Sequence, residues 1–296
     1  MNYDYYRVFL VVARCRSLTR AAEELYTSQP ALTRTIKTLE AQLGTKLFSR
    51  SKKGVTLTPE GETLYEHVEA AFTLLKKGEK EVSASTSLEK GSISIGTTIT
   101  ALDEFLFDFV ETFRASHPGI RLKINTQSSD KTIAALRQGS VDVAFVTTPY
   151  KEFSDVKGVV LKEFDNIAIC GSKFTELHQG VHTLKELSQY PFVYLSTAMQ
   201  LREYTDAVFA SEHAKIQPLI ELDSAAMIPP MVEKNLGISI VPRSLAQKYL
   251  DQGAVFEIKL AKKLPTRDVV MAESTAFPSS MANRAFIKEA KNCVGK

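Results

Sequence analysis

Five polar residues near the start of the chain have the types and spacing that base recognition requires. They are Ser28, Gln29, Thr33, Arg34 and Lys37, and they fall at the beginning of a predicted helix. Glutamine pairs well with adenine and arginine with guanine, while threonine can donate to a phosphate or touch a thymine methyl group. The start of the helix itself favours a phosphate. The pattern predicts a DNA-reading helix, with the solvated face of an ordinary three-helix bundle as the alternative.

Three short helices are needed to position these residues. Apolar residues at spacings of three and four predict a helix over 5–14, and a second helix over 20–25 can be capped by Thr19. Ser28 can cap a third helix, which tolerates Pro30 in its first turn and which Gly44 can end. Two short helices, a tight turn and a third helix predict a helix-turn-helix, whose second element enters the major groove.

A basic hairpin is expected directly after the third helix. Strand-like segments lie on either side of residues 49–54, a glycine-containing basic tip. We expect Arg50 and Lys52 to contact the DNA backbone or the minor groove, with a solvated loop as the alternative. Residues 1–58 are therefore interpreted as a winged helix-turn-helix domain.

Charge and composition limit the class of protein. Residues 1–58 contain ten Lys or Arg against four Asp or Glu, whereas the remaining residues contain 27 against 30. A basic head on a mildly acidic body favours a polyanionic partner. The 296 residues are 44% hydrophobic and 24% charged, which excludes a disordered chain and predicts about two domains. We expect a cytoplasmic protein without a membrane span, because no apolar run approaches ~18 residues, no signal peptide is evident and the three cysteines lie far apart.

Several phrases in this basic head together resemble the LysR-type transcriptional regulators. They read SLTRAAEEL (17–25), TSQPALTR (27–34), IKTLE (36–40), LG (43–44), LFSR (47–50) and LTPEG (57–61). The resemblance implies that the recognition helix starts with Ser28, Gln29, Pro30, Thr33 and Arg34, and that Arg50 is the wing arginine. Thr33 stands where the family more often has serine, which keeps the hydroxyl and adds a methyl group. The resemblance also implies promoter DNA and RNA polymerase as partners, and a dimer or a dimer of dimers.

A long helix is expected to connect the two parts of the chain. Thr58 can cap it with Pro59 in its first turn, and no strong helix breaker follows before about residue 83. A seam at spacings of three and four runs through Tyr65, Val68, Phe72, Leu75, Glu79 and Val82. The apolar side chains of this seam are expected to be buried, either against a second copy of the chain or against the chain's own domain. The resemblance favours dimerisation, so residues 59–91 are interpreted as a linker helix and hinge.

From residue 92 the chain alternates between strand-like and helix-like segments. Such alternation predicts an α/β domain with a largely parallel sheet, and two successive series predict two lobes with a cleft between them. We assign residues 92–161 plus 267–296 to one lobe and 162–266 to the other. The phrases LRQGSVDVA (136–144) and LGISIVP (236–242) resemble the family's effector-binding domain, which is similar in fold to periplasmic binding proteins. The whole chain is thus expected to be an α/β multidomain protein with a winged helix-turn-helix, a linker helix and a two-lobed effector domain.

Hydroxyl side chains follow several of the expected strands. Ligands of such sheets bind outside the carboxyl ends of the strands, near helix N-termini. We therefore expect an effector pocket lined by Thr98, Thr100, Ser129, Thr147, Ser196 and Asp223. Hydroxyls and free backbone N–H groups suit a small anion or carboxylate, although each hydroxyl by itself could be a helix cap.

No cofactor, metal site or catalytic centre is expected. The sequence has no phosphate-binding, dinucleotide-binding, hydrolase or zinc-protease motif. His178 and His182 lie four residues apart without a third ligand, and Cys170 has no partner cysteine nearby, so we expect a solvated loop and a buried core residue. Arg202 can clamp a carboxylate, but a salt bridge is the commoner use. The alternatives to a regulator are a solute-binding protein, which the basic head argues against, and an enzyme, which lacks a nucleophile–base pair.

Overall fold

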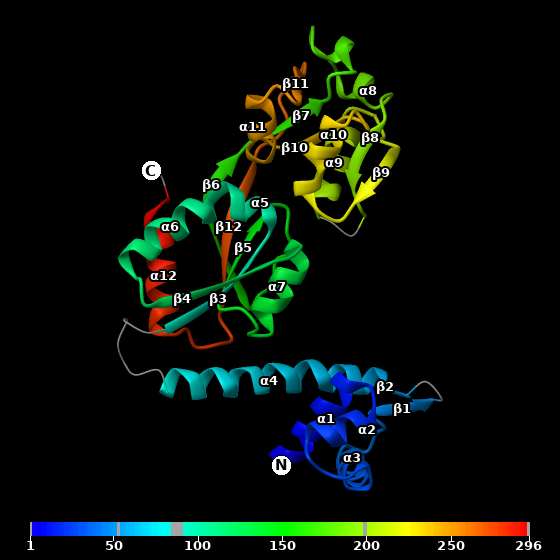
Figure 1. Cartoon of the computed structure of the whole chain (residues 1–296), viewed down its shortest axis with the longest axis vertical. Helices are drawn as coiled ribbons and strands as arrows, with labels where there is room; N and C mark the ends of the chain where they lie inside the picture. The colour runs from blue at the N-terminus through cyan, green and yellow to red at the C-terminus, as the bar shows by residue number, and fades with distance from the viewer. Residues whose placement is uncertain (1, 52–53, 84–90, 198–199, 295–296) are drawn as a thin grey trace. The chain divides into compact units, whose positions relative to one another are not determined.

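The structure, a computed structural model, describes residues 2–51, 54–83, 91–197 and 200–294 (Figure 1). The chain divides into two compact units, residues 1–83 and residues 84–296. The first unit has one hydrophobic core, around Phe9, and the second has separate cores in each of its lobes. No helix in the described ranges is long and apolar enough to cross a membrane.

The first unit contains the predicted helices and hairpin. Its elements are α1 (Tyr3–Cys15), α2 (Leu18–Glu24), α3 (Gln29–Leu43), β1 (Phe48–Ser51), β2 (Gly54–Leu57) and α4 (Pro59–Ser83). Ser28 caps α3 by accepting from the Ala31 N–H at 3.3 Å, and Gly44 ends it with a φ of 69°. The predicted cap of α2 is wrong: Ser17 accepts from the Arg20 N–H at 3.4 Å, so α2 starts before Thr19. Serine and threonine are both good caps, and the extended backbone of Ser17 decides between them.

The hairpin is held between α3 and α4 by a few polar contacts. Glu40, which is 7% exposed, accepts from the Leu47 N–H at 2.9 Å and from the Lys46 ammonium at 2.9 Å. Thr58 donates to the Lys46 carbonyl at 2.7 Å and accepts from the Gly61 N–H at 3.0 Å, which confirms it as a cap of α4. A β-carbon at Gly61 would overlap the Leu47 carbonyl oxygen. The LTPEG phrase is therefore the joint that fixes α4 against the hairpin.

Part of the predicted seam of α4 is covered by the chain's own head. Val68 and Phe72 are buried in the same core as Phe9, and the ring of Tyr3 stacks on Phe72 with centroids 4.6 Å apart. Further along the helix, Leu75 is 49% exposed. The first half of the seam thus packs within its own unit, and exposed apolar surface begins at Leu75.

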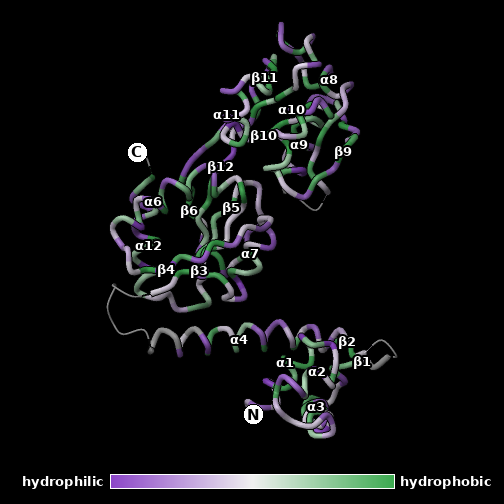
Figure 2. Tube along the Cα trace, in the orientation of Figure 1, coloured by the Kyte–Doolittle hydropathy of each residue, from purple (hydrophilic) through white to green (hydrophobic). Residues whose placement is uncertain are grey.

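The first lobe of the second unit is built on a five-stranded sheet. The strand order is β4-β3-β5-β12-β6, with β3 parallel to β4 and β5, and β12 antiparallel to β5 and β6. The hydrophobic colour of Figure 2 follows β5, which is buried at every position. The elements are β3 (Gly91–Thr97), α5 (Ile99–Ala101), the π-helix η1 (Leu102–Leu106), α6 (Phe107–Ser116), β4 (Ile120–Thr126), α7 (Ser129–Arg137), β5 (Val143–Thr147), β6 (Val156–Phe164), β12 (Arg267–Ser274) and α12 (Met281–Asn292).

The second lobe contains two small strand groups. Strand β7 pairs antiparallel with β10 and β11, while β8 and β9 pair parallel. The elements are β7 (Asn166–Cys170), η2 (Thr175–Leu177), α8 (Leu184–Leu187), β8 (Phe192–Leu195), α9 (Gln200–Ser211), β9 (Pro218–Leu222), η3 (Ala225–Met227), α10 (Ile228–Glu233), β10 (Ser239–Pro242), α11 (Arg243–Asp251) and β11 (Phe256–Ile258). The chain passes between the lobes directly after β6 and again directly before β12.

The expectation of a largely parallel sheet is wrong, because both lobes are mixed. Parallel pairs occur where a helix returns the chain to the same edge, as between β3 and β4. The antiparallel pairs in the first lobe come from β12, which returns from the second lobe and runs between β5 and β6. The alternating pattern of strand and helix does not contain this return, because it joins segments about a hundred residues apart.

Candidate functional site

The polar face of α3 is free because the opposite face is fixed in the core. Leu32, Ile36 and Leu39 are buried, and they hold the helix against α1 and α2. The side chains of Gln29 and Arg34 are consequently exposed. The face of α3 that remains open carries the residues predicted to read DNA.

These residues line one shallow surface hollow of about 500 Å³. Its lining residues are Gln29, Pro30, Thr33, Arg34 and Lys37. Within the described residues, neither Arg34 nor Lys37 forms an ion pair or a side-chain hydrogen bond. Ser28 lies beside the hollow, and its hydroxyl is used as the helix cap. Two unpaired cations and a free amide on one exposed face can bind phosphates and base edges.

The hairpin is anchored to the end of α1 rather than standing alone. The Val55 N–H donates to the Arg16 carbonyl at 3.1 Å. Gly54 has a φ of +122°, and a β-carbon there would lie 2.8 Å from the same carbonyl oxygen, so this position requires glycine. Arg50 lies on β1 opposite Val55. Lys52 lies outside the described residues.

The turn between α2 and α3 carries a residue that sequence reasoning missed. Tyr26 is 98% exposed and has a φ of 50°, a left-handed conformation that a bulky aromatic residue seldom adopts. It lies two residues before Ser28, at the same end of α3 as the polar face. The signal in the sequence was a large aromatic residue placed in a turn where a small polar residue is usual.

The four predicted pocket residues of the first lobe gather at one edge of its sheet. Thr98 directly follows β3, and Thr147 is the last residue of the adjacent parallel strand β5. The Thr98 N–H donates to the Phe145 carbonyl at 3.0 Å. Thr98, Thr100, Ser129 and Thr147 are all less than a tenth exposed. The Thr98 hydroxyl accepts from the Ala101 N–H at 3.1 Å, so it is already used as a helix cap.

The two predicted residues of the second lobe lie at the matching edge of its parallel pair. Ser196 follows β8 and Asp223 follows β9, and the Ser196 N–H donates to the Leu222 carbonyl at 2.9 Å. The Ser196 hydroxyl oxygen is inaccessible and has no hydrogen-bond partner, whereas Asp223 is exposed. The lobes meet here, because α5 contacts η3 and Ile99 packs on the core of the second lobe. Both sets of residues therefore flank one seam between the lobes.

A buried arginine at this seam was not predicted. Arg267 begins β12, is 3% exposed, and donates through Nη2 to the Thr147 hydroxyl at 2.7 Å. The sequence gives no sign of this contact, because Arg267 and Thr147 are 120 residues apart. Arg202, by contrast, is paired with Asp206 at 2.9 Å and with Glu221 at 2.8 Å, so it forms the salt bridges that its position favoured.

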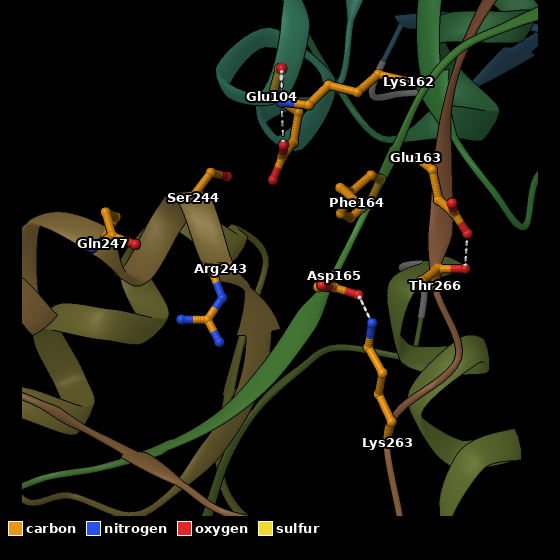
Figure 3. A pocket seen from close by; sticks show the side chains of 10 residues that line it. All are labelled: Glu104, Lys162, Glu163, Phe164, Asp165, Arg243, Ser244, Gln247, Lys263 and Thr266. Atoms are coloured by element: carbon orange, nitrogen blue, oxygen red, sulfur yellow. Dashed lines mark hydrogen bonds and ion pairs between the residues drawn. The ribbon is translucent and has the colours of Figure 1, made fainter. Parts of the chain in front are cut away.

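A separate cavity of about 420 Å³ lies where the chain crosses between the lobes (Figure 3). Its lining residues are Glu104, Lys162, Glu163, Phe164, Asp165, Arg243, Ser244, Gln247, Lys263 and Thr266, which include none of the six predicted pocket residues. Its cations are paired: Lys162 with Glu104 at 2.9 Å, Lys263 with Asp165 at 3.0 Å, and Arg243 with Glu257 at 2.6 Å. Among the described residues, the cavity therefore offers an anionic ligand no unpaired cation.

The remaining reactive side chains have structural surroundings. Cys170 is fully buried, and burial raises the pKa of its thiol to about 12, which makes it the core residue that was predicted. The ring of His178 stacks on Phe256 with centroids 4.1 Å apart, and His182 lies 3.0 Å from the Gln179 carbonyl. Within the described ranges, no cluster of three potential metal ligands occurs.

Comparison with known proteins covers nearly the whole chain. Residues 3–62 match a bacterial regulatory helix-turn-helix protein model of the lysR family, and residues 86–293 match a LysR substrate binding domain. The regulator CfxR of Cupriavidus necator is 28% identical over 96% of this chain and 90% of its own length. An uncharacterized regulator of Bacillus subtilis, YybE, is 27% identical over 88% of both chains.

Solved structures show the same fold over the full length. CbnR, a LysR family transcriptional regulator crystallised with its target DNA, has a TM-score of 0.74 at 17% identity and covers 99% of this chain and 100% of its own. Full-length OxyR from Pseudomonas aeruginosa has a TM-score of 0.66 at 21% identity and covers 99% of this chain and 94% of its own. The arrangement of a helix-turn-helix head, a long helix and a two-lobed domain is shared by these proteins.

Proposed function

This chain belongs to the LysR family of DNA-binding transcriptional regulators, and we propose that it reads promoter DNA with the exposed face of α3 under the control of a small anionic effector. The proposal rests on one observation: Arg34 and Lys37, two cations without ion pairs, lie on the face of α3 that is not packed against the core. An exposed, unpaired cation gains most from a polyanionic partner.

We assign separate tasks to the residues of this face. Gln29, Thr33 and Arg34 contact base edges in the major groove, where Arg34 suits guanine and Gln29 suits adenine. Lys37 contacts phosphates, and so do Arg50 and Lys52 of the hairpin. Two copies of the head in a dimer read an inverted repeat, because two-fold symmetry in the protein requires two-fold symmetry in the site.

The effector is expected to bind at the seam between the lobes, where Thr98, Thr100, Ser129, Thr147, Ser196 and Asp223 lie. Support comes from the position of these residues at the carboxyl ends of parallel strands in both lobes. An effector that binds two arrangements of the lobes with different affinity shifts the chain toward one of them. In an oligomer this changes the spacing of the heads, and with it DNA bending and contact with RNA polymerase.

We infer that the chain acts by binding rather than by catalysis, and that it works in the cytoplasm, where promoter DNA and RNA polymerase are found. In the described residues, the reactive groups Cys170, His178 and His182 have structural partners and form no nucleophile–base pair. A solute receptor or an enzyme that uses the cleft would have no affinity for DNA to lose, which gives the test.

The test is the salt dependence of DNA affinity, measured by fluorescence anisotropy on a labelled promoter duplex. Phosphate contacts release counterions, so a regulator that makes six of them is expected to lose about 10³-fold in affinity between 50 and 200 mM salt. Lys37→Ala should reduce the slope of log affinity against log salt by about one. The matched control is Lys288→Ala, an exposed lysine of the second unit, which should leave the slope unchanged. An affinity that does not change with salt, or equal slopes for both variants, would contradict the proposal.

A further inference from the structure

Arg267 is a buried cation with no buried anion beside it. Arg267 is 3% exposed, and burial lowers the pKa of its guanidinium to about 10. The side chain therefore still carries its charge at neutral pH. Within the described residues, no carboxylate forms an ion pair with it. Burying a charge is costly unless the charge is paired and hydrogen-bonded. Among the described residues, Arg267 is therefore a buried charge without an opposite charge beside it, and it lies at the seam between the lobes.

Two of the three guanidinium nitrogens of Arg267 donate to uncharged acceptors. Nε donates to the Thr148 carbonyl at 2.5 Å and Nη2 to the Thr147 hydroxyl at 2.7 Å. Nη1 is buried and has no hydrogen-bond partner. One edge of the guanidinium thus fixes the side chain to the end of β5, and the N–H groups of Nη1 are left to donate elsewhere.

A second buried polar side chain lies in the same region. Asn166, at the start of β7, is 6% exposed, and its amide forms no hydrogen bond of ordinary distance and angle in the described structure. The amide lies close enough to the Tyr204 hydroxyl to favour the ionised form of that tyrosine. Tyr204 connects the two residues. The guanidinium carbon of Arg267 lies 5.1 Å from the centre of the Tyr204 ring, and burial raises the pKa of this tyrosine while Arg267 and Asn166 both oppose the rise.

The groups around the Arg267 side chain and the neighbouring Tyr204 come from both lobes. Thr147 ends β5 of the first lobe and Thr148 follows it, while Asn166 and Tyr204 belong to β7 and α9 of the second lobe. The ring of Phe164, at the end of β6, lies 5.3 Å from the guanidinium carbon. An anion held here contacts both lobes at the point where the chain crosses between them.

We propose that Arg267 and Asn166 bind the carboxylate group of a small organic acid, and that this carboxylate is the part of the effector that the chain selects. The proposal rests on the proposed function, because it specifies the ligand of the same seam. The carboxylate accepts hydrogen bonds from Nη1 of Arg267 and from the amide nitrogen of Asn166. Charge-assisted donation from arginine to a carboxylate is stronger than donation to a neutral acceptor. Arg202 shows the contrast, since its carboxylate partners are supplied by the chain itself.

The test is thermal unfolding of the full-length chain with carboxylate probes at constant ionic strength. Sodium acetate and sodium benzoate at 20 mM are the probes, and sodium chloride and benzamide are the matched controls. We expect both carboxylates to raise the Tm of the wild-type chain by about 3 °C or more through preferential binding to the folded state. Sodium chloride and benzamide should give no rise. An equal rise with chloride, or no rise with either carboxylate, would overturn the proposal.

Variants separate binding from a structural role. Arg267→Met should abolish the rise with carboxylate, and without any probe it should unfold at the same temperature as the wild type or higher, because it removes an unpaired buried charge. Arg137→Met, at a surface arginine paired with Asp155 at 2.9 Å, should keep the full rise. If Arg267→Met unfolds several degrees lower without a probe, the arginine is structural and the proposal fails. Salt-dependent DNA binding of the wild type, measured in parallel, shows whether the proposed function stands when this proposal does not.

Discussion

The cations without ion pairs are exposed to solvent in one unit of the molecule and buried in the other. In the head, Arg34 and Lys37 stand on the open face of α3 beside a shallow hollow. In the effector domain, Arg267 is enclosed between two lobes. Exposed cations suit an extended polyanion whose binding weakens with salt, whereas an enclosed cation suits one small anion and is little screened. The comparison separates a surface that binds DNA from a site that selects a ligand.

The largest expected effect comes from a substitution that destabilises the head, residues 1–83, and leaves the effector domain folded. In Gly61→Ala, the new β-carbon overlaps the Leu47 carbonyl oxygen, so α4 or the hairpin must move. We expect a loss of about 3 kcal/mol in the free energy of unfolding of the head and a loss of DNA binding. The Tm rise with acetate should remain, because Arg267 lies in the other unit. Differential scanning calorimetry and anisotropy measure the two properties.

The matched control for this substitution lies on the same helix. Gly78→Ala meets no atom within 4 Å, so it should leave the head unchanged or stabilise it by about 0.5–1 kcal/mol. If Gly61→Ala also abolished the response to acetate, the two units would not be independent, and the comparison between them would fail.

A smaller effect is expected where a buried carboxylate fixes the hairpin. Burial by itself would raise the pKa of Glu40, but the hydrogen bonds from Lys46, Leu47 and Phe48 hold it below its ordinary value of 4.5. A carboxyl group with a lowered pKa in the folded state stabilises the protein above its unfolded pKa, and this contribution is lost as pH falls through the folded value. Glu40→Gln should therefore cost about 1–2 kcal/mol at pH 7, and progressively less as pH falls below 4.5.

Urea unfolding of the wild type and the variant at pH 7, 5 and 3.5 measures this dependence. Glu66→Gln, at an exposed glutamate of α4, should cost little at any pH. A difference between wild type and Glu40→Gln that stayed constant across this range would show that the charge of Glu40 does not stabilise the hairpin.

The head could be predicted from sequence because its signals are local. The cap at Ser28 and the glycine at position 44 lie at the two ends of one helix, and the structure confirms both of them. The prediction of Thr19 as the cap of α2 was wrong, because Ser17, two residues earlier, suits a cap equally well and only the backbone distinguishes them. The burial of Val68 in the core of the head also could not be predicted from the apolar seam of α4. Helical periodicity shows that a face is buried, but it does not identify the surface that buries it.

The effector domain was predicted as a two-lobed α/β unit, but its site depends on contacts between distant segments. The hydroxyl of Thr147 was predicted from its place at the end of a strand, while its partner Arg267 is 120 residues away. Strands β6 and β11 and helix α11 were not predicted. Strand β6 is buried only at Leu161 and Phe164 and shows no alternation, β11 has three residues, and α11 buries only Ala246. The antiparallel return of β12 explains both the mixed sheet and the buried arginine.

The most direct test of the central claim is selection of bound duplexes from a random DNA pool at 100 mM salt, with the wild type and Arg34→Ala in parallel. We expect the wild type to enrich an inverted repeat. Arg34→Ala should bind that repeat about 10- to 100-fold more weakly and lose its preference at one position in each half-site. If the wild type enriches no sequence, or if both proteins enrich the same sequence with equal affinity, α3 does not read DNA through Arg34 and the account is wrong.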